Sequence, residues 1–312
     1  MNESKFMNKI SKIPVPLLPA MVGACTLSNV YLTLGFSWLR HIFMILGAVL
    51  IVCYFIKIIG SFDIVKKEYT TTVPSSLYAG FTMLLMILGS YVFDFHAGIG
   101  KGIWFVGLIL HGLHILAFTF LHVLKGVKME TFLPSWFVTY VGILVSCVVG
   151  GAMEEKAILT VIVYYGIVIY FILLFFLFYR LIKYPIKEPT YHTLAIIMAP
   201  CCLCLVGYLN IIDTPNATLV WVLYACVFVS LLFVLSKIPK FFSFSFTPGF
   251  AGMTFPMAIG VVASAKMSGY LSNTGFESLA EIVKEVQGIQ IYVTTIIIGF
   301  VLYNFVRHMK NC

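Results

Sequence analysis

Three histidines in one apolar run are the side chains with the widest chemical range in this chain. His111, His114 and His122 lie in the segment LHGLHILAFTFLHVL. His111 and His114 are three residues apart, so on a helix they share a face, and such a pair can bind a metal or a haem. That interpretation would make the chain a membrane haem or metal redox protein. The other histidines lie near the ends of apolar runs, so hydrogen bonds across helices or at a subunit contact are the favoured interpretation.

A second group with possible chemistry is the cysteine cluster Cys201, Cys202 and Cys204, which follows Pro200. Thiols in this arrangement could capture a soft metal or react with an oxyanion such as tellurite. Adjacent cysteines do not easily face one site, so packing as small apolar side chains is favoured. We therefore expect no metal, no cofactor and no enzymatic activity.

The most unusual backbone is expected in the stretch TPGFAGMTFPM, which covers residues 247–257. Proline inside a helix removes a hydrogen-bond donor, so Pro256 should free the carbonyl of Gly252 and bend the helix. Broken backbone survives in a bilayer only beside protein or a water-filled cavity. This stretch, with Phe255 directly before the bend, is therefore the first candidate for lining a pathway.

Composition places these segments in a membrane. The chain has 312 residues, of which 61% are hydrophobic and 10% are charged, with a mean hydropathy of +1.03. A membrane span needs about 20 apolar residues. This length predicts a single transmembrane domain over residues 1–312 with ten spans, at 14–36, 39–60, 74–93, 100–124, 134–152, 156–181, 191–210, 217–236, 248–267 and 286–307. The lipid bilayer is thus an expected partner. Nucleic acid is not, because the net charge of +8 is dispersed over short loops.

The distribution of charge predicts the orientation of the spans. With the N-terminus inside, 15 of the 20 basic residues fall on the inner side, and the outer side keeps only Arg40, Lys101, Lys156, Lys266 and Lys284. This asymmetry follows the positive-inside rule and predicts a multi-pass protein of the inner or plasma membrane with both termini cytoplasmic. Four tryptophans near span ends are expected to be interfacial anchors: Trp38, Trp104, Trp136 and Trp221.

An internal repeat organises the spans into pairs. A proline opens each odd-numbered span, at steps of 60, 60, 55 and 59 residues: Pro14, Pro74, Pro134, Pro189 and Pro248. This spacing predicts five helical hairpins, over residues 14–60, 74–124, 134–181, 189–236 and 248–307. Odd spans are rich in small and hydroxyl residues, whereas even spans are bulkier and uniformly apolar. Since small residues let helices approach one another, we expect an inner ring of five helices around a pore, surrounded by five outer helices.

The predicted pore is lined by small residues and by the prolines that bend the inner helices. These candidates are Pro19, Gly23, Gly142, Pro200, Gly252, Thr254, Pro256 and Gly260. The odd spans contain no Asp or Glu, which argues against an ion-coupled carrier and against a cation pore. Lys266 near the end of the ninth span favours anions. A carrier for dicarboxylates would need basic residues at mid-depth, and the spans offer none.

The motifs resemble the tellurite-resistance and dicarboxylate transporter family, which includes bacterial tellurite resistance protein A and the plant guard-cell slow anion channel. The similarity rests on TFPM in the ninth span with the Gly- and Ala/Ser-rich turn after it, on Leu18-Pro19-Ala20 leading to Ala24, and on Ala199-Pro200. The resemblance implies ten helices as five hairpins, an inner five-helix pore, a homotrimer, and a phenylalanine gate that corresponds to Phe255. We therefore expect a channel for small inorganic or organic anions; the alternative is a secondary carrier or exporter for dicarboxylate, sulfite or tellurite.

Overall fold

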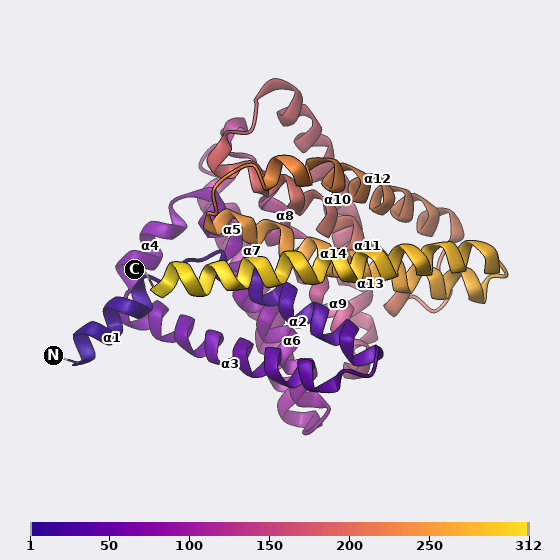
Figure 1. Ribbon diagram of the computed structural model, residues 1–312, viewed down its shortest axis with the longest axis horizontal. Helices are drawn as coiled ribbons and strands as arrows, with labels where there is room; N and C mark the ends of the chain where they lie inside the picture. The colour runs from indigo at the N-terminus through magenta and orange to yellow at the C-terminus, as the bar shows by residue number, and fades with distance from the viewer. Residues whose placement is uncertain (1, 311–312) are drawn as a thin grey trace.

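A computed structural model describes the backbone of residues 2–310 and the side chains of residues 6–309. Within this range all regular secondary structure is helical (Figure 1). Eight helical segments are long and apolar enough to cross a membrane: Ser37–Gly60, Thr72–Phe93, Ala97–His122, Lys156–Lys183, Glu188–Ile211, Ala217–Phe241, Pro248–Asn273 and Glu277–Met309. The chain is therefore an all-helical, multi-pass membrane protein, and eight of the predicted spans correspond to these segments.

The other two predicted spans are helical but do not form long continuous helices. The first is α2 (Leu17–Thr33), which has only 17 residues. The fifth is divided into α8 (Trp136–Tyr140), η2 (Gly142–Leu144), α9 (Val145–Val149) and η3 (Gly151–Met153). Glycine weakens helices because it loses more backbone freedom on folding than other residues do, and Gly142, Gly150 and Gly151 lie at these breaks. The count of ten spans therefore stays a prediction.

Burial divides the long segments into two groups. In the most apolar stretch of α5 (Thr72–Leu77) with α6 (Ala79–Phe93), of η4 (Glu188–Ile197) with α11 (Met198–Ile211), and of η5 (Pro248–Met253) with α13 (Thr254–Asn273), 67–83% of the residues are buried. The corresponding share is 28–39% for α3 (Ser37–Gly60), α7 (Ala97–His122), α10 (Lys156–Lys183), α12 (Ala217–Phe241) and α14 (Glu277–Lys310). The bulky even-numbered segments thus expose apolar side chains, as lipid-facing helices do.

The buried segments pack against one another in a cyclic order. α2 packs against α6, α6 against α9, α9 against α11, α11 against α13, and α13 against α2. In Figure 1 the N-terminus and the C-terminus lie at the same end of the molecule. We call this end the terminal end and the other the far end. Small side chains permit these contacts: a Cβ on Gly80 would lie 3.0 Å from the backbone nitrogen of Pro19.

Three prolines mark the start of α-helical structure in the buried segments. Pro19, Pro200 and Pro256 are each the third residue of their helix, α2, α11 and α13. A proline in the first turn removes no α-helical hydrogen bond, because that N–H has no partner four residues earlier. In α11 and α13 the preceding residues form the 3₁₀ helices η4 and η5. The break expected at Pro256 therefore takes the form of a change from 3₁₀ to α structure.

The helix that carries the predicted tenth span is longer than the span: α14 begins at Glu277, before residue 286, because the charged stretch ahead of the apolar run is also helical, and its 34 residues extend about 51 Å. The prediction that four tryptophans are interfacial anchors needs correction. Trp38 and Trp221 are exposed as interfacial anchors should be, but Trp104 and Trp136 are buried. Proximity to a span end did not reveal that these two indoles pack inside the protein.

Candidate functional site

Phe255 borders two cavities among the buried helices. One cavity, which we call the narrow cavity, has a volume of about 20 Å³; the other, the Lys266 cavity, has a volume of about 350 Å³. Among the described residues only Phe255 lines both, and it is 5% exposed. Phe255 therefore borders both spaces.

The narrow cavity is apolar throughout. Its lining residues come from all five predicted odd spans: Pro19, Leu77, Met83, Phe137, Val138, Gly142, Ile196, Ala199, Pro200, Leu203, Ala251, Gly252, Phe255 and Pro256. A volume of about 20 Å³ has room for about one water molecule. None of the lining side chains carries a charge or a hydrogen-bonding group, so this space offers an ion no tight binding site.

The Lys266 cavity is wider and contains a cation. Besides Lys266 it is lined by Asn29 and Gln287 and by the hydroxyl residues Thr26 and Thr33. Three other basic residues that were predicted for the outer side form ion pairs: Arg40 with Asp94 at 2.6 Å, Lys101 with Glu155 at 2.7 Å, and Lys156 with Asp213. Lys266 forms no ion pair with any described residue. Its charge is therefore uncompensated where it borders the cavity.

The residues predicted from sequence occupy two kinds of position. Pro19, Gly142, Pro200, Gly252, Phe255 and Pro256 line the narrow cavity, and Lys266 lines the wider one. Gly23, Thr254 and Gly260 line neither, and lie instead where helices touch. Gly260 faces the side chain of Met198.

The contact between α2 and α13 fixes the position of Phe255. A Cβ on Gly23 would lie 2.6 Å from the backbone nitrogen of Phe255 and 2.7 Å from the carbonyl carbon of Thr254. The Thr254 hydroxyl lies 2.7 Å from the carbonyl oxygen of Ala251 and 3.2 Å from that of Pro19, so it can donate to either. Only glycine at position 23 allows this close approach, so the backbone that carries Phe255 is held directly against α2.

Two more cavities continue from the narrow cavity. The His192 cavity, of about 160 Å³, shares Leu77, Ile196 and Gly252 with it. The Arg180 cavity, of about 450 Å³, shares Val73, Pro189 and Thr190 with the His192 cavity. A series of neighbouring spaces therefore leads away from Phe255 on the side opposite to Lys266.

The α7 histidines form hydrogen bonds across helices. His111 Nε2 lies 2.9 Å from the carbonyl oxygen of Thr139, and its Nδ1 lies 2.7 Å from the Thr82 hydroxyl. His114 Nδ1 and the Tyr69 hydroxyl lie 2.8 Å apart and share a hydrogen bond, and burial raises the pKa of Tyr69 to about 12, so this hydroxyl stays protonated. His122 Nε2 lies 3.0 Å from the carbonyl oxygen of Tyr69. These partners leave His111 without a nitrogen for a metal.

The cysteine cluster also packs inside the protein. Cys201, Cys202 and Cys204 are buried on α11. The Cys201 thiol lies 3.2 Å from the Ser230 hydroxyl of α12. Among the described residues no group of three His, Cys, Asp or Glu side chains is arranged to hold a metal ion.

Comparison with known protein families adds to this geometry. Residues 14–309 match the family model described as voltage-dependent anion channel. The chain belongs to the voltage-dependent anion channel family. This membership confirms the resemblance based on TFPM and the proline motifs, and it places the chain among membrane channels and transporters for anions. No curated protein matches the chain closely enough to be informative.

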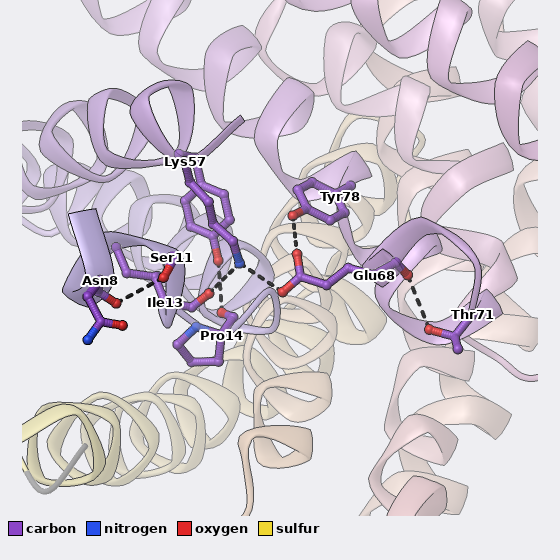
Figure 2. Close-up of polar contacts among 9 residues, drawn as sticks. Asn8, Ser11, Ile13, Pro14, Lys57, Glu68, Thr71 and Tyr78 are labelled. Carbon is purple, nitrogen blue, oxygen red and sulfur yellow. Dashed lines mark hydrogen bonds and ion pairs between the residues drawn. The ribbon is translucent and has the colours of Figure 1, made fainter. Parts of the chain in front are cut away.

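A buried charged cluster at the terminal end was not predicted. Figure 2 shows Lys57 of α3 between the turn that precedes α2 and Glu68 of α4 (Phe62–Tyr69). The Lys57 ammonium donates to the Ile13 carbonyl and to Glu68, both at 2.8 Å, and its side chain has no exposed surface. Glu68 also accepts from the Tyr78 hydroxyl, at the junction of α5 and α6. The cluster therefore ties the starts of two cavity-lining segments together.

Proposed function

We propose that the chain is a membrane channel for small anions whose pathway is closed by the side chain of Phe255. The observation that carries this proposal is that, within the described part of the chain, only Phe255 lines both the narrow cavity and the Lys266 cavity. An anion moving from one cavity to the other would have to pass its ring. Removing the ring would join a space of about 350 Å³ to the narrow cavity beyond it.

Charge supports anions as the permeating species. No Asp or Glu lines the narrow cavity or the Lys266 cavity, whereas Lys266 borders the latter without an ion pair among the described residues. A cation pathway would be expected to present carboxylates, and a positive charge at its entrance would repel cations. Lys266 would raise the local concentration of anions beside Phe255.

The cyclic packing supports a five-helix pore. We propose that α2, the third span, the broken fifth span, α11 and α13 form an inner ring, and that α3, α7, α10, α12 and α14 surround it as the outer members of five hairpins. The neighbours of each inner segment follow this order. The terminal end would face the cytoplasm, because most basic residues lie there. A homotrimer in the inner or plasma membrane remains our expectation from the family.

The carrier alternative receives less support from the pathway. Alternating transport of a dicarboxylate needs cations that meet both carboxylates, and the narrow cavity has none. The same holds for a carrier or exporter that binds sulfite or tellurite tightly at mid-depth. Anions passing through such an apolar constriction would bind weakly, as expected for a channel.

The test is the current carried by purified Phe255→Ala protein in planar bilayers under a chloride or nitrate gradient. We expect a conductance about tenfold or more above the parent, with a reversal potential set by the anion gradient. Phe305→Ala is the matched control, because Phe305 is equally buried but lies on α14, away from both cavities. An unchanged current would contradict the gate. A reversal potential set by the cation, or flux that saturates at low turnover, would contradict an anion channel.

A further inference from the structure

His192 is a buried side chain that the proposed pathway does not yet use. It lies on η4 with only 2% of its surface exposed, and it lines the His192 cavity. Its Nε2 lies 3.2 Å from the carbonyl oxygen of Phe241, so Nε2 carries the hydrogen and donates it. The ring also packs on Phe250, with the ring centroids 4.0 Å apart. Both contacts fix the imidazole in place.

The second ring nitrogen of His192 has no partner. With the hydrogen on Nε2, Nδ1 is a lone-pair acceptor, and no hydrogen bond reaches it from any described residue. A buried acceptor without a partner is costly, since it has lost water and gained nothing. Protonation would turn Nδ1 into a donor and give the ring a positive charge.

The unpartnered Nδ1 lies close to Gly249, which has no side chain to fill the space beside it. A Cβ built on Gly249 would lie 3.8 Å from His192 Nδ1, 3.3 Å from the Thr247 hydroxyl oxygen and 3.8 Å from the carbonyl oxygen of Pro189. Gly249 itself lines the His192 cavity. His192 Nδ1 and the Thr247 hydroxyl oxygen thus both lie within 4 Å of one position beside Gly249, and His192 and Gly249 border a cavity of about 160 Å³.

Among the described residues, His192 is the only titratable side chain that lines this cavity. On η4 the other ionisable side chains are Glu188 and Tyr191. The elements packed against η4 are α8, α11, α12, α13 and η5. Their ionisable side chains are Tyr140 on α8, Cys201, Cys202, Cys204 and Tyr208 on α11, Tyr224, Cys226, Lys237 and Lys240 on α12, and Lys266 and Tyr270 on α13. η5 has none. Lys240 lies over the Tyr191 ring at 5.0 Å. Lys237 and Lys240, at this end of α12, disfavour a further positive charge on His192. An anion that binds beside His192 would offset this repulsion and so favour protonation of the ring.

We propose that His192 Nδ1 and the Thr247 hydroxyl form a binding site for a small inorganic anion, and that the anion binds together with one proton. The proton adds to Nδ1, and Nδ1–H and the Thr247 O–H then donate to the anion. Because the site lies beyond the narrow cavity from Phe255, it rests on the proposed anion pathway, and it would place a positive charge between the narrow cavity and the Arg180 cavity. Reciprocal linkage follows: acid strengthens anion binding, and the anion strengthens proton binding.

The first test measures this linkage without any transport. In the full-length protein in detergent, the His192 ring signal is followed by NMR during a pH titration in sodium nitrate and in sodium gluconate, whose anion is too large for the site. His192→Gln assigns the signal. We expect the titration midpoint to lie about half a pH unit or more higher in nitrate. Equal midpoints in the two salts would overturn the proposal, whether or not the protein conducts.

The second test uses the Phe255→Ala protein in planar bilayers at low nitrate concentration. Acidifying both chambers from about pH 7.5 to about pH 5.5 should raise the current about threefold or more, because acid favours the protonated imidazole that binds the anion. Adding His192→Gln should abolish the rise, since the amide can still donate to Phe241 but cannot take the proton. Gly249→Ala, which fills the open position, should reduce it.

The control for these variants is His96→Gln, an exposed histidine at the start of α7. It should keep the full response to acid. A response that persists in the His192→Gln protein, or a Phe255→Ala current that ignores pH, would overturn the proposal and leave the gate intact. Absence of any Phe255→Ala current would instead count against the proposed channel, and the NMR titration would still decide the site.

Discussion

The two cavities that meet at Phe255 differ in size and in chemistry. The Lys266 cavity holds about 350 Å³ and is lined by a lysine, two amides and two hydroxyls, whereas the narrow cavity holds about 20 Å³ and has only apolar lining. In the proposed channel, Lys266 would attract anions on one side and the ring of Phe255 would close the path, so the two effects rest on different residues. This separation means that each can be changed without the other, which the following variants exploit.

The largest loss of stability is expected for Gly23→Ala, which changes the contact between α2 and α13 beside Phe255. The added Cβ would lie 2.6 Å from the Phe255 nitrogen, so α2 and α13 must move apart. We expect a loss of about 2 kcal/mol of stability, typical of overpacking, and a disturbed position of Phe255. Thermal unfolding in detergent, followed by tryptophan fluorescence, measures the loss of stability.

The same substitution at Gly98 is the matched control, because a Cβ there meets nothing within 4 Å. In an exposed helix it should be neutral or slightly stabilising. Equal stability of the Gly23→Ala and Gly98→Ala proteins would contradict the close contact that fixes Phe255.

A smaller loss of stability is expected when the buried cluster of Lys57 and Glu68 at the terminal end is disrupted. Lys57→Met removes the ion pair with Glu68 and the bond to the Ile13 carbonyl. Since Glu68 is 25% exposed and can recover some hydration, we expect a cost of about 1–2 kcal/mol. Thermal unfolding measures this effect as well. Lys66→Met, at an exposed position of α4, should change nothing, and similar losses in both proteins would count against the cluster.

The smallest effect is expected from removing the charge of Lys266, which borders the Lys266 cavity. In the Phe255→Ala background, Lys266→Ala should lower nitrate conductance about twofold at low ionic strength and have little effect near 1 M salt, where charges are screened. Lys284→Ala is the control, because Lys284 is exposed on α14 and borders neither cavity. A loss that persists at high salt would show that Lys266 does more than attract anions.

Residue size and pattern predicted much of the fold but could not assign every small residue. Small side chains correctly indicated which segments are buried, since they report close packing wherever it occurs. They could not distinguish packing against a cavity from packing against another helix. Gly142 and Gly252 border the narrow cavity, whereas Gly23 and Gly260 contact other helices, although all four have the same composition signal.

Long-range polar contacts were beyond sequence reasoning for a different reason. Lys57 and Glu68 are separated by a turn in the sequence, and only the fold shows that the Lys57 ammonium is buried between the Ile13 carbonyl and Glu68. His192 was noted only as a residue near a span end, and its unpartnered Nδ1 depends on the approach of Phe241 and Gly249 from other segments. Phe255, by contrast, could be singled out because it directly precedes a proline in a motif shared with the family.

The most direct measurement of the central claim is single-channel conductance as a function of side-chain size at position 255. Phenylalanine, leucine and alanine should give conductances that increase in that order, with alanine about tenfold or more above phenylalanine, while the preference for anions over cations stays the same. Conductances independent of the residue at position 255 would contradict the account, because the ring would then not be the barrier between the two cavities.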